Sequence, residues 1–138
     1  KIAVVTREAS SGSRFSFESL LGLTRVIKDR LVSDISPNNL VVNSNSMVKT
    51  LVNHNSQAIG FISTGSVDRS IKAIKFEGVE ATPETIANHQ YQLSRPFLLL
   101  HYPEKDKQET KELFRFIQSD RVKKLIEEYG YIPTTKYK

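Results

Sequence analysis

Near its start the chain reads Ile2-Ala3-Val4-Val5-Thr6-Arg7-Glu8-Ala9-Ser10-Ser11-Gly12-Ser13-Arg14. The apolar run over residues 2–5 has the length and composition of a buried strand, and a turn of small residues follows it. Phe15, Phe17, Leu20 and Leu21 come next, at a spacing that suits the buried side of a helix. The stretch therefore predicts a strand, a tight turn and a helix, in that order.

The turn has the make-up of an anion-binding site. The first N–H groups of a helix have no carbonyl partner within it, and the positive end of the helix dipole lies beside them. Ser10, Ser11 and Ser13 add hydroxyl donors, and Gly12 lets an oxyanion approach the main chain closely. Arg7 carries a planar guanidinium that fits two oxygens of a tetrahedral anion. These five residues are the candidate ligand contacts.

A plainer interpretation explains the same residues. Serine-rich turns with a glycine open many helices only as caps, and an arginine at the end of a strand is usually a solvated charge. The neighbouring Glu8 is expected to pair with a nearby base such as Arg14. The residues alone leave both interpretations of the turn open.

Length and composition set limits on the function. The 138 residues suffice for one domain with a real core, and 38% hydrophobic and 25% charged residues are typical of a soluble globular protein. The net charge of +5 favours anionic partners without separating phosphate from nucleic acid. No cysteine is present, which excludes disulfides and thiolate sites, and no apolar run reaches the roughly 20 residues that cross a bilayer. The chain opens inside an expected strand without an initiator methionine or signal peptide, so we expect a fragment.

Three segments together carry a resemblance to a known family. They are Arg7-Glu8-Ala9-Ser10-Ser11-Gly12-Ser13-Arg14-Phe15, Ala58-Ile59-Gly60-Phe61 and Gly130-Tyr131-Ile132-Pro133. From Ile2 to about Thr134 the chain resembles the second half of the phosphate-binding subunit of bacterial phosphate ABC transporters. The resemblance implies that Arg7, Ser11, Gly12 and Ser13 contact phosphate, with Ser13 where threonine is usual.

The resemblance also implies the setting of the protein. The intact protein would be the extracytoplasmic substrate-binding component of an ABC importer, in the periplasm or at the cell surface, and a membrane-anchored lipoprotein. Its partners would be inorganic phosphate, the transporter permease and the first lobe, which this chain lacks. Sulfate or molybdate remains an alternative ligand, because the acceptor that distinguishes phosphate belongs to the first lobe in the resembling family.

The rest of the chain alternates strand and helix patterns. This alternation predicts an α/β fold with a largely parallel or mixed sheet flanked by helices, and the resemblance makes it one lobe of a two-lobed periplasmic binding protein-like fold. Residues 1–138 would form that single lobe. The further expected elements are a second turn or helix from Gly22 to Val32, a strand over 40–42, a helix capped by Ser46, strands over 58–63 and 71–76, and a helix with Thr82 as its cap and Pro83 at its first position.

The last third of the chain is expected to differ in character. Residues 91–100 predict a return strand, with Pro96 fixing its entry. The resemblance implies that this segment is a hinge between the two lobes. Residues 104–130 predict an amphipathic helical segment with a break near Ser119 and an end at Gly130. In the resembling family this segment packs on the first lobe, so here its apolar side would turn to its own lobe or to a second copy of the chain.

Other functions find little support in the sequence. An enzyme acting on phosphate esters needs an activated nucleophile or a metal, yet His54, His89 and His101 stand far apart and Ser11 has no evident base. No metal site, cofactor or catalytic residue is therefore predicted. Nucleic acid is not expected either, because the basic residues are interspersed with acids and aromatic residues do not alternate with them.

Overall fold

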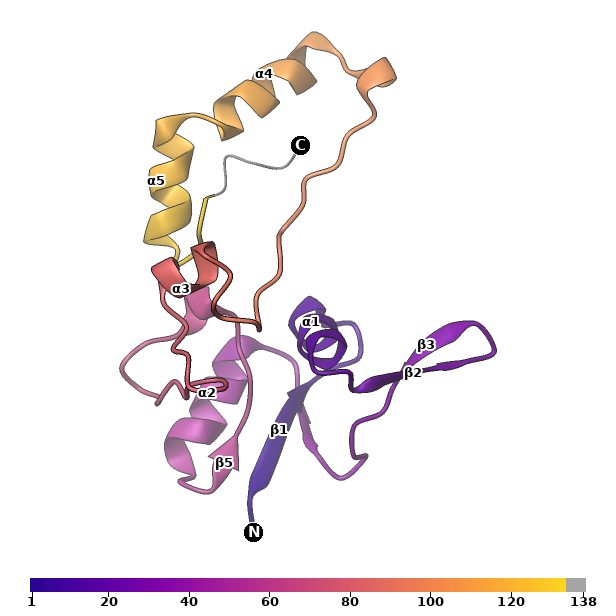
Figure 1. Cartoon of the computed structure of the whole chain (residues 1–138), viewed down its shortest axis with the longest axis vertical. Helices are drawn as coiled ribbons and strands as arrows, with labels where there is room; N and C mark the ends of the chain where they lie inside the picture. The colour runs from indigo at the N-terminus through magenta and orange to yellow at the C-terminus, as the bar shows by residue number, and fades with distance from the viewer. Residues whose placement is uncertain (134–138) are drawn as a thin grey trace. The chain divides into compact units, whose positions relative to one another are not determined.

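The computed structural model describes residues 1–133 and divides into two compact units, Lys1–Leu93 and Ser94–Lys138 (Figure 1). The first unit contains all the strands of the described residues together with helices, and the second contains helices without strands. That residues 1–138 make up a single lobe stays a prediction.

A three-stranded parallel sheet forms the centre of the first unit. Its order is β4-β1-β5, with β1 at Ala3–Arg7, β4 at Leu40–Val42 and β5 at Ala58–Ile59. The predicted strand, turn and helix at the start of the chain are confirmed, since β1 leads through the turn into α1 (Gly12–Leu20). The predicted strand over 40–42 is also confirmed.

A small apolar core joins helix α2 (Asn45–His54) to this sheet. Val5, Val42 and Val48 are buried together, and Leu51, Val52, Ala58 and Ile62 pack around them. The backbone of Gly60 lies so close to α2 that an added Cβ would be 2.7 Å from Cγ1 of Val48. A glycine in a strand segment often marks such a close approach, and the neighbour here is helix α2. The packing of α2 against the sheet fixes where its first turn lies.

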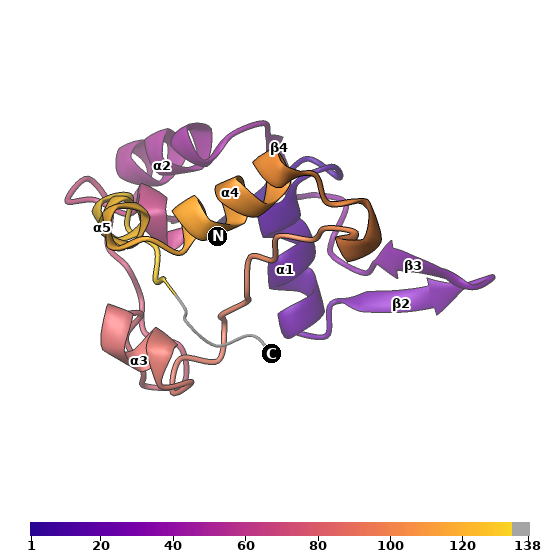
Figure 2. The same cartoon turned by 90° about the horizontal axis from the view of Figure 1, so that it is seen from above.

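The chain between α1 and β4 is a β-hairpin, so the prediction of a helical segment as far as Val32 is wrong. Gly22, with a positive φ, follows α1 as expected, but β2 (Thr24–Ile27) and β3 (Arg30–Ser33) then pair antiparallel. Lys28 and Asp29 between the two strands both have positive φ, as the two central residues of a type I′ hairpin turn require. The hairpin projects away from α1 and the sheet in both views (Figures 1 and 2).

The remainder of the first unit contains little regular structure. The strand expected over 58–63 is limited to Ala58–Ile59, and the strand expected over 71–76 is not formed, since only an isolated bridge joins Phe76 to Val79. A short 3-10 turn, η1, covers Thr64–Ser66. Helix α3 (Pro83–Ala87) has the predicted Thr82 cap and Pro83 at its first position.

The second unit is helical in its later part. Residues 94–100 contain no strand, and neither do residues 91–93 before them, so the return strand predicted over 91–100 is wrong, while its role as a hinge stays a prediction. A 3-10 turn, η2 (Pro103–Lys105), precedes α4 (Gln108–Ile117) and α5 (Asp120–Glu128). The predicted break lies at Ser119, whose hydroxyl caps α5, and Gly130 follows α5 with positive φ.

Candidate functional site

Two strand ends meet at one edge of the parallel sheet. Arg7, the last residue of β1, lies opposite Val42, the last residue of β4, and the Glu8 amide donates to the Val42 carbonyl at 3.2 Å. Each strand leads through a short turn into a helix, α1 after β1 and α2 after β4. Because parallel strands end at the same edge, the starts of both helices lie near this edge.

The five predicted site residues lie along the turn from β1 into α1. Ser11 is the cap of α1, and its hydroxyl oxygen accepts from the Arg14 amide at 3.2 Å. Gly12 and Ser13 are the first two helical residues, and Ser10 is exposed in the turn before them. An added Cβ on Gly12 would meet no atom within 4 Å, so the main chain there is open to an approaching molecule.

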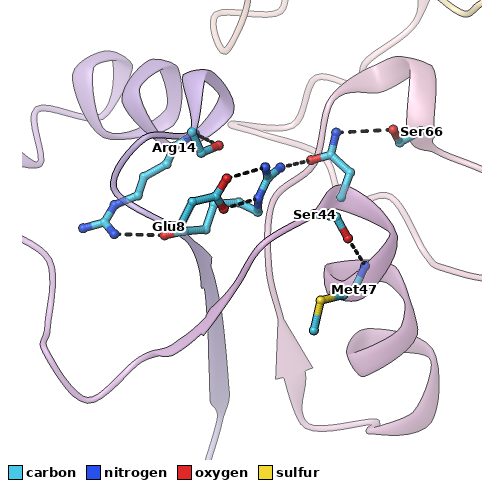
Figure 3. Close-up of polar contacts among 8 residues, drawn as sticks. Glu8, Arg14, Ser44, Met47 and Ser66 are labelled. Atoms are coloured by element: carbon cyan, nitrogen blue, oxygen red, sulfur yellow. Dashed lines mark hydrogen bonds and ion pairs between the residues drawn. The ribbon is translucent and has the colours of Figure 1, made fainter.

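The guanidinium of Arg7 is held between Glu8, which Figure 3 labels, and Asn45. Its Nε and Nη2 donate to the two carboxylate oxygens of Glu8 at 2.9 and 3.0 Å, and its Nη1 donates to Oδ1 of Asn45 at 2.7 Å. The Arg7 side chain is only 12% exposed. A solvated surface charge, the plainer interpretation of this arginine, does not agree with that burial.

Glu8 pairs with Arg7, so the prediction that its partner is a base such as Arg14 is wrong. Arg14 instead donates through Nε to Glu18 at 2.7 Å, one turn later in α1, and through Nη1 to the carbonyl of Arg7 at 2.9 Å. Its Nη2 reaches Oγ of Ser33 in the hairpin at 3.2 Å. Arg14 therefore fixes α1 against the end of β1 and leaves Glu8 to Arg7.

The contacts of Arg7 keep Glu8 ionised. Its hydrogen bonds with the Arg7 side chain lower the pKa of the Glu8 carboxyl below its ordinary value, with a further contribution from the nearby charge of Arg14. The positive charge of Arg7 is thus partly balanced by one carboxylate. The open start of α1 and the arginine held at the same sheet edge suit a small oxyanion better than a cation.

The described residues offer no alternative centre for metal chemistry. No group of three or more histidine, cysteine, aspartate or glutamate residues among residues 1–133 is arranged to hold a metal ion. Within the same part of the chain, no helix combines the length and the apolar character that crossing a membrane requires.

The α/β architecture is that of about half of a periplasmic binding protein. The crystal structure of an ABC-type phosphate transport receptor from Vibrio cholerae matches 97% of the chain with a TM-score of 0.86 and 64% sequence identity, and the chain covers 53% of that receptor. A Clostridium perfringens protein, described as a phosphate ABC transporter substrate-binding protein with bound phosphate, matches 97% of the chain with a TM-score of 0.79 and 34% identity, and 52% of it is covered.

Sequence comparison leads to the same group of proteins. The phosphate-binding protein PstS 2 of Streptococcus agalactiae is 36% identical over 133 residues, which are 96% of this chain and 45% of that protein. No family model matches the chain. The chain spans about half the length of the relatives it matches. The resemblance to the phosphate-binding subunits of phosphate ABC transporters is therefore confirmed over part of their length.

Sequence reasoning missed two features of this site. The cap of α2 is Ser44, whose hydroxyl accepts from the Met47 amide at 3.0 Å, and not the predicted Ser46. The contact between Arg7 and Asn45 was also missed, because 38 residues separate them in the sequence. The available signal was the position of Asn45 shortly after an apolar strand, which places it at the same sheet edge as Arg7 if the two strands are neighbours.

Proposed function

We propose that the chain is part of the substrate-binding component of an ABC phosphate importer, and that it binds inorganic phosphate at the start of α1. The contacts are the Arg7 guanidinium, the backbone N–H groups of Gly12 and Ser13, and the hydroxyls of Ser10, Ser11 and Ser13. The observation that carries this proposal is an arginine held at the sheet edge where the open start of α1 follows β1. The relatives named as phosphate-binding proteins support it.

Neutral N–H and O–H donors that are already in place before the ligand arrives explain how such a site binds phosphate. A dianion among N–H and O–H groups is stabilised by charge-assisted hydrogen bonds without a full counter-charge. Each such bond contributes on the order of 1.5–3 kcal/mol, so a shell made of the donors of one lobe binds weakly and a second lobe completes it. The role is capture without catalysis.

The setting of the intact protein follows from the same proposal. It acts outside the cytoplasmic membrane, in the periplasm or at the cell surface, as a membrane-anchored lipoprotein that delivers phosphate to a permease. A first lobe closes over the phosphate and supplies the acceptor that distinguishes phosphate from sulfate. The segment of residues 104–130 packs on that lobe; without it, the partner of its apolar side is its own lobe or a second copy of the chain.

A phosphate titration, monitored through the backbone amide signals in nuclear magnetic resonance spectra, tests this proposal. With millimolar phosphate at low salt, we expect the amides of Ser11, Gly12 and Ser13 to shift and saturate. Sulfate is expected to bind within a few-fold of phosphate, because the discriminating acceptor lies in the other lobe.

Two arginine variants make a matched pair for this titration. Arg7→Ala and Arg25→Ala remove the same charge, and Arg25 lies in the hairpin with its side chain 61% exposed. We expect Arg7→Ala to abolish the phosphate shifts and Arg25→Ala to preserve them. If both variants lost the phosphate shifts equally, the binding would be a general effect of net charge. If the shifts persisted in Arg7→Ala, Arg7 would not be a phosphate contact.

A further inference from the structure

Asn45 joins Arg7, at the end of β1, to the 3-10 turn η1. Its Oδ1 accepts from Arg7 Nη1 at 2.7 Å, and its Nδ2 donates to Oγ of Ser66 in η1 at 3.4 Å. The guanidinium carries only donors, so the amide oxygen must face it and the amide nitrogen must face the serine. The dashed lines of Figure 3 trace this series of hydrogen bonds from Glu8 to Ser66.

The position of Asn45 is set by the packing of α2 and not by Arg7. Asn45 is the first residue of the helix, directly after its cap Ser44, and Val48 one turn later is part of the buried core. Lys49, in the same turn as Val48, forms an ion pair with Asp68, two residues beyond Ser66. Asn45 is therefore a fixed point against which a long, flexible arginine is held.

The contact leaves the arginine both ordered and charged. Glu8 and Asn45 together engage three of the five N–H groups that a guanidinium carries. The two others have no partner among residues 1–133 and stay available to an anion. Because the Asn45 amide is neutral, it orders the side chain without adding a second negative charge to that of Glu8.

We infer that Asn45 is a positioning residue for oxyanion binding: it fixes the Arg7 guanidinium beside the start of α1 before a ligand arrives. This inference rests on the proposed function, since it assigns Asn45 a part in the same site. A purely structural role for Asn45 in the docking of α2 is the alternative. The two differ in whether the loss of Asn45 acts on Arg7 or on the stability of the fold.

Three variants of the full chain separate these roles. Asn45→Ala removes the acceptor, Asn45→Asp keeps it and adds a charge, and Asn53→Ala changes an exposed asparagine near the other end of α2. Each variant is measured by the Nε–Hε signal of Arg7 in the absence of ligand, by phosphate titration, and by thermal unfolding. Asp in the first turn of a helix is favourable, so Asn45→Asp is expected to stay folded.

For Asn45→Ala we expect the Arg7 Nε–Hε signal to broaden or move toward that of free arginine, and the phosphate dissociation constant to rise about tenfold. Asn45→Asp should keep a resolved Arg7 signal and still bind phosphate more weakly, because the new carboxylate repels the anion. Asn53→Ala should change neither quantity.

Two results would overturn the inference. An unchanged Arg7 signal in Asn45→Ala would show that Asn45 does not position the arginine, and so would a loss of phosphate affinity that Asn53→Ala reproduces. Failure of the proposed function has a different signature: phosphate shifts that persist in Arg7→Ala. The Arg7 signal is recorded without phosphate, so it tests the positioning by Asn45 in either case.

Discussion

Two strand–helix pairs of the first unit are built in the same way and differ at the first residue of the helix. In β1–α1 and in β4–α2 a parallel strand ends at the same sheet edge, and a serine hydroxyl caps the following helix. The first helical residue is Gly12 in α1 and Asn45 in α2. Gly12 leaves the backbone donors open, whereas the Asn45 side chain turns to Arg7. One helix start is thus free to bind, and the other supports the arginine.

The largest expected effect comes from placing a charge at the open helix start. Gly12→Asp has room for its side chain and, by the helix dipole, slightly favours α1, yet its carboxylate would lie where the phosphate binds. Since like charges in contact cost several kcal/mol, we expect at least about a hundredfold loss of phosphate affinity with no loss of melting temperature. Calorimetric titration and thermal unfolding measure the two effects.

Ser46→Asp is the matched control for that change. Ser46 is exposed in the first turn of α2, so the substitution adds the same charge with the same favourable helix dipole. We expect a far smaller loss of affinity than for Gly12→Asp. Similar losses in the two variants would mean that the two helix starts do not differ in function.

A second contrast concerns two glycines. Gly60→Ala would place its Cβ 2.7 Å from Val48 Cγ1, whereas Gly12→Ala would meet nothing within 4 Å. Overpacking of this kind costs about 1–3 kcal/mol, so Gly60→Ala should lower the free energy of unfolding by that amount while Gly12→Ala leaves it nearly unchanged. Urea denaturation measures both, and equal stability of the two variants would contradict the close packing of α2 on the sheet.

A third contrast uses the two helix caps. Ser11→Ala and Ser44→Ala each remove a hydroxyl that accepts from the third helical amide, so each should cost about 1 kcal/mol of stability. Only Ser11→Ala should also weaken phosphate binding, because only that hydroxyl lies in the proposed site. If Ser44→Ala weakened phosphate binding as much, the start of α2 would have to be part of the site as well.

What the sequence predicted well is local. The strand and the start of α1 follow from neighbouring residues, as does the end of that helix shortly before Gly22. The hairpin was missed because Lys28-Asp29 is not the Asn-Gly or Asp-Gly pair that usually signals such a turn. Residues 91–100 have strand-forming side chains, but a strand also needs a partner, which local sequence does not specify.

The site was predictable in part for the same reason. Ser11, Gly12 and Ser13 are contiguous, so their place at the helix start could be inferred from the order of residues alone. The partners of Arg7 could not be inferred in this way. Asn45 reaches Arg7 only because β4 lies beside β1 in a particular register. Glu8 illustrates the limit, because two bases lie within reach along the chain and only the packed structure decides between them.

The smallest expected effect is the pH dependence of the Arg7 contacts. Hydrogen bonds from Arg7 lower the pKa of Glu8 below its ordinary value of 4.5, so the stabilisation from this pair is fully present above about pH 4.5 and is lost as pH falls through the lowered pKa. We expect the Arg7 Nε–Hε signal to stay constant from neutral pH to about 4.5 and to move only in stronger acid.

The ion pair at α2 provides the comparison for that titration. The Asp68 carboxyl has a pKa well below its ordinary range, chiefly because Lys49 donates a hydrogen bond to it and Ser70 adds two more. Both carboxylates should therefore remain ionised in mild acid, which carbon-13 spectra of the side-chain carboxyls would record. Glu8→Gln should abolish the acid shift of Arg7 and leave that of Asp68 intact. If Glu8 instead titrated at its ordinary pKa, the ion pair with Arg7 would not be maintained in solution, and Asn45 alone would hold the arginine.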